Sequence, residues 1–274
     1  MTFIERVQAL EPLGFSEVQT RFLVTVALHS GFCLRRHYTT FAGLKYGQGV
    51  RDFLERLVAR KLARRFAFRP DRGHVYHLHA SSIYEAIGQG DNRNRRPTSP
   101  ALIARKLMIL DYVLTQPDAD WFATEQDKVR LFTTQYGIDR ADLPQRVYLA
   151  GDGQGSRTTR YFVHKLPLFR TGDPPVVSFV FLVTDTTGSG LTRFLHDHVR
   201  LLRRLPDWRI IALAPRHIPG LLACSAAFQR AFVAPPETAG ERGHLETPGV
   251  FSGSRSHRPK RAHGSHGEGD RRVP

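Results

Sequence analysis

Three features of the sequence predict a mixed α+β protein. Hydrophobic residues recur at helical spacing through residues 16–61, two short β runs follow, and beyond residue 157 apolar strands alternate with amphipathic helices. At 274 residues the chain has room for two modest domains, or for one larger domain with appendages. We expect an N-terminal helical domain at 1–87, a basic linker at 88–100, a small α/β domain at 101–234 and a disordered tail at 235–274.

The first helix is predicted to begin after Ser16. Gln19 stands three residues on, which is the capping-box arrangement in which each side chain satisfies the other's free backbone amide. Gly31 is expected to end the helix. Its apolar stripe comprises Val18, Phe22, Leu23, Val26 and Ala27.

Two more helices and a β-hairpin follow. We predict a short helix at 34–42, with Tyr38 and Phe41 facing inward, and a third helix at 48–61. Two short β runs at 62–69 and 74–78 flank a Pro-Asp-Arg-Gly turn. Three helices followed by a β-hairpin is the order of a winged helix-turn-helix. The buried face of the third helix is expected to consist of Val50, Phe53, Leu54, Leu57 and Val58.

The second half of the chain has a different order of predicted helices and strands. A short helix at 81–87 and a linker rich in glycine and arginine lead to a helix at 101–114. The segments 158–169 and 175–185 are β-rich, and the run VVSFVFLV is typical of a central strand buried on both faces. Alternation then continues with a helix at 191–205, a strand at 208–214 and a helix at 219–232, which predicts a small α/β domain with some parallel pairing.

The tail after Ala234 consists mainly of Gly, Pro, His, Arg and Ser. Such a composition buries too little apolar surface to offset its ordering entropy, so we expect disorder. The tail is interpreted either as a segment that attracts nucleic acid through Arg-Pro-Lys-Arg at 258–261, or as an extension without function.

Positive charge is concentrated at the N-terminal side. The chain has a net charge of +15 and a pI near 10.5, which points to a polyanionic partner, either nucleic acid or an acidic membrane surface. Residues 14–69 hold eleven lysines and arginines against three acids. Because cations displace counterions condensed on phosphates, this density favours double-stranded DNA as the partner.

The N-terminal part of the third helix would meet base edges in the major groove. Glutamine pairs well with adenine and arginine with guanine, which suits direct readout. The expected base contacts are Tyr46, Gln48, Arg51 and Glu55. The expected phosphate contacts are Arg35, Arg36, Lys45, Arg69 and Arg72. The alternative is a solvated basic face on a winged helix that binds protein rather than DNA.

Nothing in the sequence predicts a membrane protein, a cofactor or a metal site. No apolar run approaches the roughly 20 residues that a spanning helix needs, and the N-terminus lacks the features of a secretory signal. Cys33 and Cys224 are expected to be buried, reduced thiols of a cytoplasmic protein. Gly-Asp-Gly-Gln-Gly-Ser at 151–156 lacks the lysine of a phosphate loop and is predicted to be a turn.

The histidines are interpreted as structural. His77 and His79 share a strand face near His74, but no cysteine or carboxylate is close in sequence. His196 and His198 are two apart on a helix, so they are expected to point in different directions.

A metal-dependent nuclease is the alternative function. Asp173 and Asp185 flank the VVSFVFLV strand, and two carboxylates could hold Mg²⁺ for phosphodiester hydrolysis. Restriction-endonuclease-like folds follow the first aspartate with an Asp/Glu-x-Lys triplet, whereas Asp185 is followed by two threonines. We therefore interpret both residues as aspartates that cap a turn.

The patterns FSEVQTRFLVTVALHSG, RRHYTTFAG and FLERLVARKLARRF, followed by a linker and an α/β region, give the chain a recognisable layout. Over residues 15–232 it resembles the replication-relaxation proteins of bacterial plasmids and integrative elements. The resemblance implies a cytoplasmic DNA-binding regulator, or a replication or transfer accessory factor, whose α/β domain is similar to a degenerate restriction-endonuclease-like fold. We expect a homodimer, in which the helix at 101–114 supplies the contact or serves only as an interdomain strut.

Overall fold

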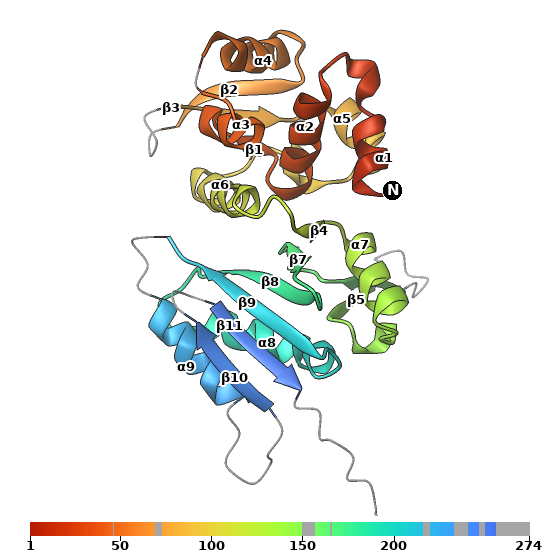
Figure 1. The fold of residues 1–274 in the computed structure, drawn as a ribbon, viewed down its shortest axis with the longest axis vertical. Helices are drawn as coiled ribbons and strands as arrows, with labels where there is room; N and C mark the ends of the chain where they lie inside the picture. The colour runs from red at the N-terminus through yellow and green to blue at the C-terminus, as the bar shows by residue number, and fades with distance from the viewer. Residues whose placement is uncertain are drawn as a thin grey trace, which may run out of the picture.

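A computed structural model describes residues 1–45, 47–68, 73–149, 157–164, 166–215, 220–232, 241–246 and 250–255. The fold is mixed α+β, as the sequence predicts, with a helical upper part stacked on a lower part built around a mixed sheet (Figure 1). Within these residues no helix is long and apolar enough to cross a bilayer.

The upper part contains helices and one small antiparallel sheet. The sheet order is β1–β3–β2, so the short strand β1 pairs with the far strand of the hairpin. The elements are α1 (Phe3–Gln8), η1 (Glu11–Leu13), α2 (Glu17–His29), β1 (Phe32–Cys33), α3 (Arg35–Ala42), α4 (Gln48–Ala59), β2 (Ala63–Phe68), β3 (Gly73–Leu78) and α5 (Ser81–Ala86).

The start of α2 confirms the predicted capping box. The Ser16 side chain accepts a hydrogen bond from the backbone N–H of Gln19. Gln19 Oε1 in turn accepts one from the backbone N–H of Ser16 at 3.2 Å. Phe22 is completely buried and packs against Tyr38 of α3 and Phe53 of α4, which fixes the three helices around one aromatic centre. The prediction was wrong for Val18, which is 45% exposed, because it lies on the outer side of the helix.

The segment expected to be a linker is packed against the upper part. It contains the single turn η3 (Arg93–Arg95), where the Asn94 side chain donates to the carbonyls of Ala27 and Leu28 at 3.0 and 3.1 Å. Gly31 has a φ of +77°, and a Cβ there would collide with the Asn94 carbonyl oxygen. Residues 92–95 therefore close the C-terminal end of α2 instead of spanning open solvent.

Helix α6 (Pro100–Leu114) belongs to both parts of the molecule. Ile103 and Leu107 are buried with Phe32 and neighbouring residues of the upper part, and Leu110 lies in the main upper core. Two residues further on, Tyr112 contacts Phe169 of the lower sheet at a ring distance of 6.0 Å. The sequence prediction places this helix at the start of the second domain, and in the structure its apolar residues contact both parts. Its buried face serves as an intramolecular strut.

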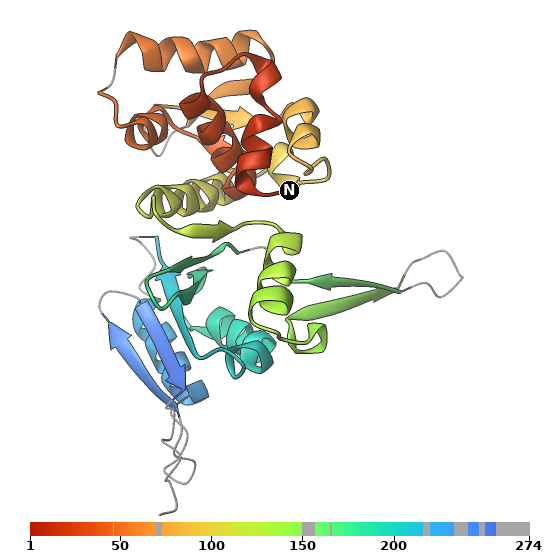
Figure 2. The same ribbon diagram turned by 45° about the vertical axis from the view of Figure 1, so that its right-hand side comes forward.

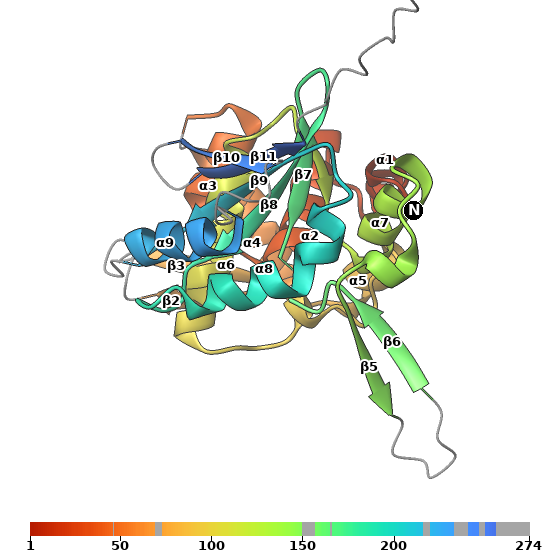
Figure 3. The same cartoon turned by 90° about the horizontal axis from the view of Figure 1, so that it is seen from below.

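The lower part holds a sheet of order β10–β11–β9–β8–β7–β4, in which β8 and β9 are parallel and the other neighbours antiparallel. Helices α8 and α9 cover one face (Figure 3), with Phe179 and Trp208 in the shared core. Strand β8 is central and buried, as VVSFVFLV predicts. The elements are β4 (Asp120–Phe122), α7 (Glu125–Arg130), η4 (Leu131–Gln135, a π-helix), η5 (Arg140–Asp142), β5 (Gln145–Leu149), β6 (Arg157–Tyr161), β7 (Leu168–Thr171), β8 (Val176–Leu182), α8 (Ser189–Leu202), β9 (Asp207–Leu213), α9 (Leu221–Phe232), β10 (Glu241–Glu246) and β11 (Val250–Arg255).

The predicted disorder of the tail is wrong for β10 and β11. Strand β11 pairs with β9 from Val250 opposite Ile211 to Ser254 opposite Asp207, and β10 pairs with β11. Composition misleads here because strand addition satisfies the backbone groups of the β9 edge and does not require apolar side chains. The basic sequence at 258–261 lies outside the described residues.

Buried polar contacts join the two parts. Arg6 of α1 donates two hydrogen bonds to the Asp127 carboxylate of α7, at 3.0 and 3.1 Å, and both side chains are almost fully buried. His29 at the end of α2 packs edge-on against Trp121 of β4 at 5.2 Å. Burial, followed by the charge of nearby Lys128, lowers the pKa of His29 to about 3, so its imidazole is neutral at pH 7.

Candidate nucleic-acid interface

Helix α4 presents one apolar and one polar face. Val50, Phe53, Leu54 and Leu57 are buried, as predicted, while Val58 is only half-buried. The opposite side of the helix is polar because the intervening residues are charged or amide-bearing. That outer face carries Gln48, Arg51, Asp52, Glu55 and Arg56.

Several outer side chains are already engaged with neighbours. Gln48 Nε2 donates to Asp52 Oδ1 at 2.6 Å, one helical turn away. Glu55 accepts from Arg65 of β2 at 2.6 Å, which ties α4 to the hairpin. Glu55 was predicted to contact a base, but in the structure it is held by this ion pair.

Lys45 and Arg51 are exposed cations of this surface, as is Arg56, which donates to Gln19 Oε1 at 2.7 Å. Neither Lys45 nor Arg51 has a hydrogen-bond or ion-pair partner for its side chain among the residues that the structure describes. Tyr46, Arg69 and Arg72, which the sequence also predicts as contacts, lie outside those residues. Of the predicted base contacts, Gln48, Arg51 and Glu55 have observed positions on α4, and Glu55 is held by its ion pair with Arg65.

The two arginines at the start of α3 have protein partners. Arg35 Nε donates to the Tyr76 hydroxyl at 3.4 Å, and Arg36 donates to Asp111 of α6 at 2.8 Å. Arg36 was predicted to contact phosphate, and in the structure it pairs with a carboxylate 75 residues away in the sequence.

Asp111 receives a second hydrogen bond from His37. The Leu34 amide donates to His37 Nδ1 at 3.1 Å, so Nε2 carries the proton and donates to Asp111 Oδ1 at 2.8 Å. Partial burial alone would raise the pKa of Asp111, but the hydrogen bond from His37 and the charge of Arg36 lower it. The carboxylate is therefore ionised at neutral pH and fixes α3 against α6.

The strand histidines have structural roles. His77 stacks on Phe32 with ring centroids 4.2 Å apart, and its Nε2 lies 3.0 Å from the Asn94 carbonyl oxygen. Burial lowers the pKa of His77 to about 4. Among the described residues no group of three or more His, Cys, Asp or Glu could hold a metal ion.

The two aspartates of the nuclease alternative lie at opposite ends of β8. Asp173 precedes this strand and Asp185 follows it, so at about 3.3 Å per residue roughly 20 Å of strand separates them. Asp185 instead accepts from the amides of Thr187 and Gly190 at 2.9 and 3.2 Å. These hydrogen bonds lower its pKa against the opposing effect of desolvation. Asp185 caps the turn before α8, and the pair cannot share one metal ion.

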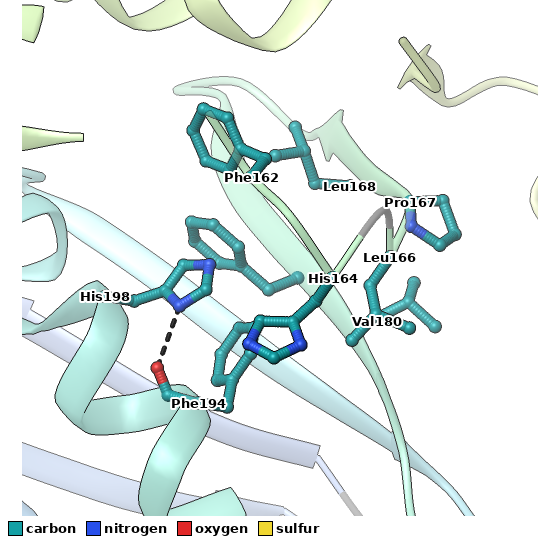
Figure 4. Close-up of a pocket in the computed structure, with 9 residues that line it drawn as sticks. Phe162, His164, Leu166, Pro167, Leu168, Val180, Phe194 and His198 are labelled. Carbon is teal, nitrogen blue, oxygen red and sulfur yellow. Dashed lines mark hydrogen bonds between the residues drawn. The ribbon is translucent and has the colours of Figure 1, made fainter. Parts of the chain in front are cut away.

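The lower part contains a small pocket between β7, β8 and α8. Its lining is apolar except for His164 and His198 (Figure 4). His198 Nδ1 donates to the Phe194 carbonyl oxygen at 2.8 Å, and burial lowers the pKa of His198 to about 3. Cys33 and Cys224 are buried free thiols, as predicted, and burial raises the pKa of Cys33 to about 12 and that of Cys224 to about 11.

The sequence interpretation places β6 in a β-rich segment but missed β5, and with it the basic hairpin that the two strands form. Its strands contain Arg146, Arg157 and Arg160 and no acid. The lack of acidic residues in these two strands is visible in the sequence. Residues 145–149, however, have too little apolar periodicity to predict a strand. No family model, curated protein or solved structure matches this chain.

Proposed function

We propose that the upper part binds double-stranded DNA as a winged helix-turn-helix. The observation that carries the proposal is the order α2–β1–α3–α4–β2–β3 with sheet order β1–β3–β2, because it places one polar helix beside a β-hairpin. The missed strand β1 completes the three-stranded sheet expected of a winged helix. Helix α4 would enter the major groove and the β2–β3 hairpin would follow the backbone.

Specific roles follow from the partners described above. Arg51 and Gln48 would read base edges, and Lys45 and Arg35 would contact phosphates. Glu55 and Arg36 act instead as positioning residues, since their ion pairs fix α4 to β2 and α3 to α6. Tyr46, Arg69 and Arg72 remain predicted contacts.

The biological role that we propose is that of a cytoplasmic regulator, or of a replication or transfer accessory factor of mobile DNA. It rests on the resemblance in layout and on the basic upper part. The alternative of a winged helix that binds only protein makes a different prediction, namely weak dependence on salt. The nuclease alternative loses its support with the separation of Asp173 and Asp185.

The test is a salt series of duplex binding, followed by fluorescence anisotropy, on the full chain. We expect a steep salt slope and a loss of about 1–3 kcal/mol on Arg51→Ala, because an arginine that reads a guanine contributes that much discrimination. Arg193→Ala on α8 removes the same charge from an exposed site on the lower part and should leave affinity unchanged. Equal behaviour of the two variants, with a flat salt slope, would contradict the proposal.

A further inference from the structure

The β5–β6 hairpin projects from the lower part as an arm (Figure 2), which we define as Gln145–Leu149 and Arg157–Tyr161. The strands are antiparallel, with Arg146 opposite Arg160 and Leu149 opposite Arg157. Every residue of β5 is exposed, and Leu149 is 70% exposed. An isolated two-stranded hairpin is only marginally stable in water. An exposed arm of this kind therefore points to a function that compensates for its low stability.

The base of the arm is anchored, so the arm has a defined direction. Glu125 Oε1 of α7 accepts from the Tyr161 amide at 2.8 Å, and its Oε2 lies 3.8 Å from Arg160. The Phe162 amide donates to the Pro144 carbonyl at 2.8 Å, and the Phe162 ring stacks on Phe132 in the lower core. The strands beyond this anchor extend away from the body (Figure 3).

The charge of the arm points to a polyanion. Its described residues include three arginines and no acid, and Arg146 and Arg157 have no carboxylate partner within the part of the chain that the structure describes. Arg146 faces Arg160 directly across the strands, and like charges in that position destabilise a hairpin. A partner dense in phosphate would remove this repulsion, whereas a second copy of a chain with net charge +15 would add to it.

The shape of the arm agrees with the same partner. A two-stranded ribbon fits the major groove of duplex DNA. The face that carries Arg146 and Arg160 also carries Tyr148 and Thr158, whose hydroxyls donate to phosphate oxygens. In Figure 1, α4 lies at the top of the molecule and β5 at the right of the lower part, so the arm and the α4 surface lie on different sides of the protein.

We infer that the arm is a second DNA-binding element, which contacts the phosphates of a duplex segment other than the one held by α4. The bridging of two segments rests on the proposed function, whereas the contact between the arm and DNA does not. The protein would thus hold two stretches of DNA together, as a looping or pairing factor does.

The test is co-capture of two duplexes by the full-length protein. One biotinylated duplex is fixed on beads, and retention of a second, fluorescent duplex is measured. Arg146→Gln/Arg160→Gln should reduce retention of the second duplex at least about fivefold at moderate salt, because two phosphate contacts on one face of the arm are lost. Binding of a single duplex through α4 should change less than about twofold. The matched control, Arg193→Gln/Arg203→Gln on α8 and its C-cap, removes the same charge and should behave like the parent chain.

The outcomes are distinguishable. Unchanged retention in the arm variant, or an equal loss in the α8 control, overturns the inference. A lower molecular mass of the arm variant in light scattering without DNA also overturns it, because the arm would then bind a second copy. Failure of the proposed function has another signature, since Arg51→Ala would leave single-duplex binding intact. Far-UV circular dichroism checks that the arm variant folds like the parent chain.

Discussion

At the scale of single residues, Gly31 illustrates how backbone geometry restricts sequence. We expect Gly31→Ala to destabilise the protein by at least about 2 kcal/mol, since it adds a collision with the Asn94 carbonyl to the strain of a positive φ. The measurement is urea unfolding followed by circular dichroism. Gly43 is a matched control, because its φ is +63° and a Cβ added there would meet no neighbour within 4 Å. Equal losses of unfolding free energy in the two variants would show that the contact between Gly31 and residues 92–95 adds nothing to the destabilisation.

The residues of the candidate surface divide by whether their partners are near or far in sequence. The Ser16–Gln19 capping box and the buried residues of α4 follow from local spacing, and the structure confirms them. The Arg36–Asp111 pair joins residues 75 apart, and no local pattern can reveal it. The sequence therefore identifies the cations of this surface. It does not show which of them have protein partners.

At the scale of one element, α8 carries neighbouring histidines in opposite environments. His196 is exposed and His198 is buried, as their spacing predicts. Because the folded pKa of His198 is about 3 and the ordinary value is 6.5, protons bind the unfolded chain preferentially as pH falls below 6.5. Stability is thus lost between pH 6.5 and 3.

The free energy of unfolding of the parent chain is expected to fall between pH 7 and pH 5. We expect His198→Asn to make this fall smaller by up to about 2 kcal/mol. Asparagine keeps a donor for the Phe194 carbonyl. His196→Asn is the matched control, because it removes an exposed histidine from the same helix. Both profiles are obtained from urea unfolding at each pH, and identical slopes for the two variants would argue against a neutral, buried His198.

Other elements show where sequence patterns fail. Strand β1 has only two residues, Phe32 and Cys33, which is too short for any periodicity to register. The strands β10 and β11 form in a segment whose composition favours disorder, because their pairing uses backbone groups. By contrast, the long apolar run that forms β8 could be assigned as a buried central strand from the sequence alone.

At the scale of the whole molecule, the buried Arg6–Asp127 pair joins the two parts. We expect Arg6→Met to cost about 3–5 kcal/mol, because it leaves the buried Asp127 carboxylate with only the exposed Arg130, 3.8 Å away, as a cationic neighbour. The double variant Arg6→Met/Asp127→Asn should recover most of that loss in urea unfolding. Arg65→Met, which breaks an exposed pair, should cost less than about 1 kcal/mol. A double variant as unstable as Arg6→Met would contradict this expectation.

Helix α6 also bears on how the protein can be rearranged. Its residues complete the core of the upper part and also contact the lower sheet, so a chain cut before Pro100 would lose Ile103, Leu107 and Leu110 from the upper core. A chimera that exchanges only one half with another protein must therefore bring a helix suited to both surfaces. The smallest unit that keeps both cores intact is the two parts together with the helix between them.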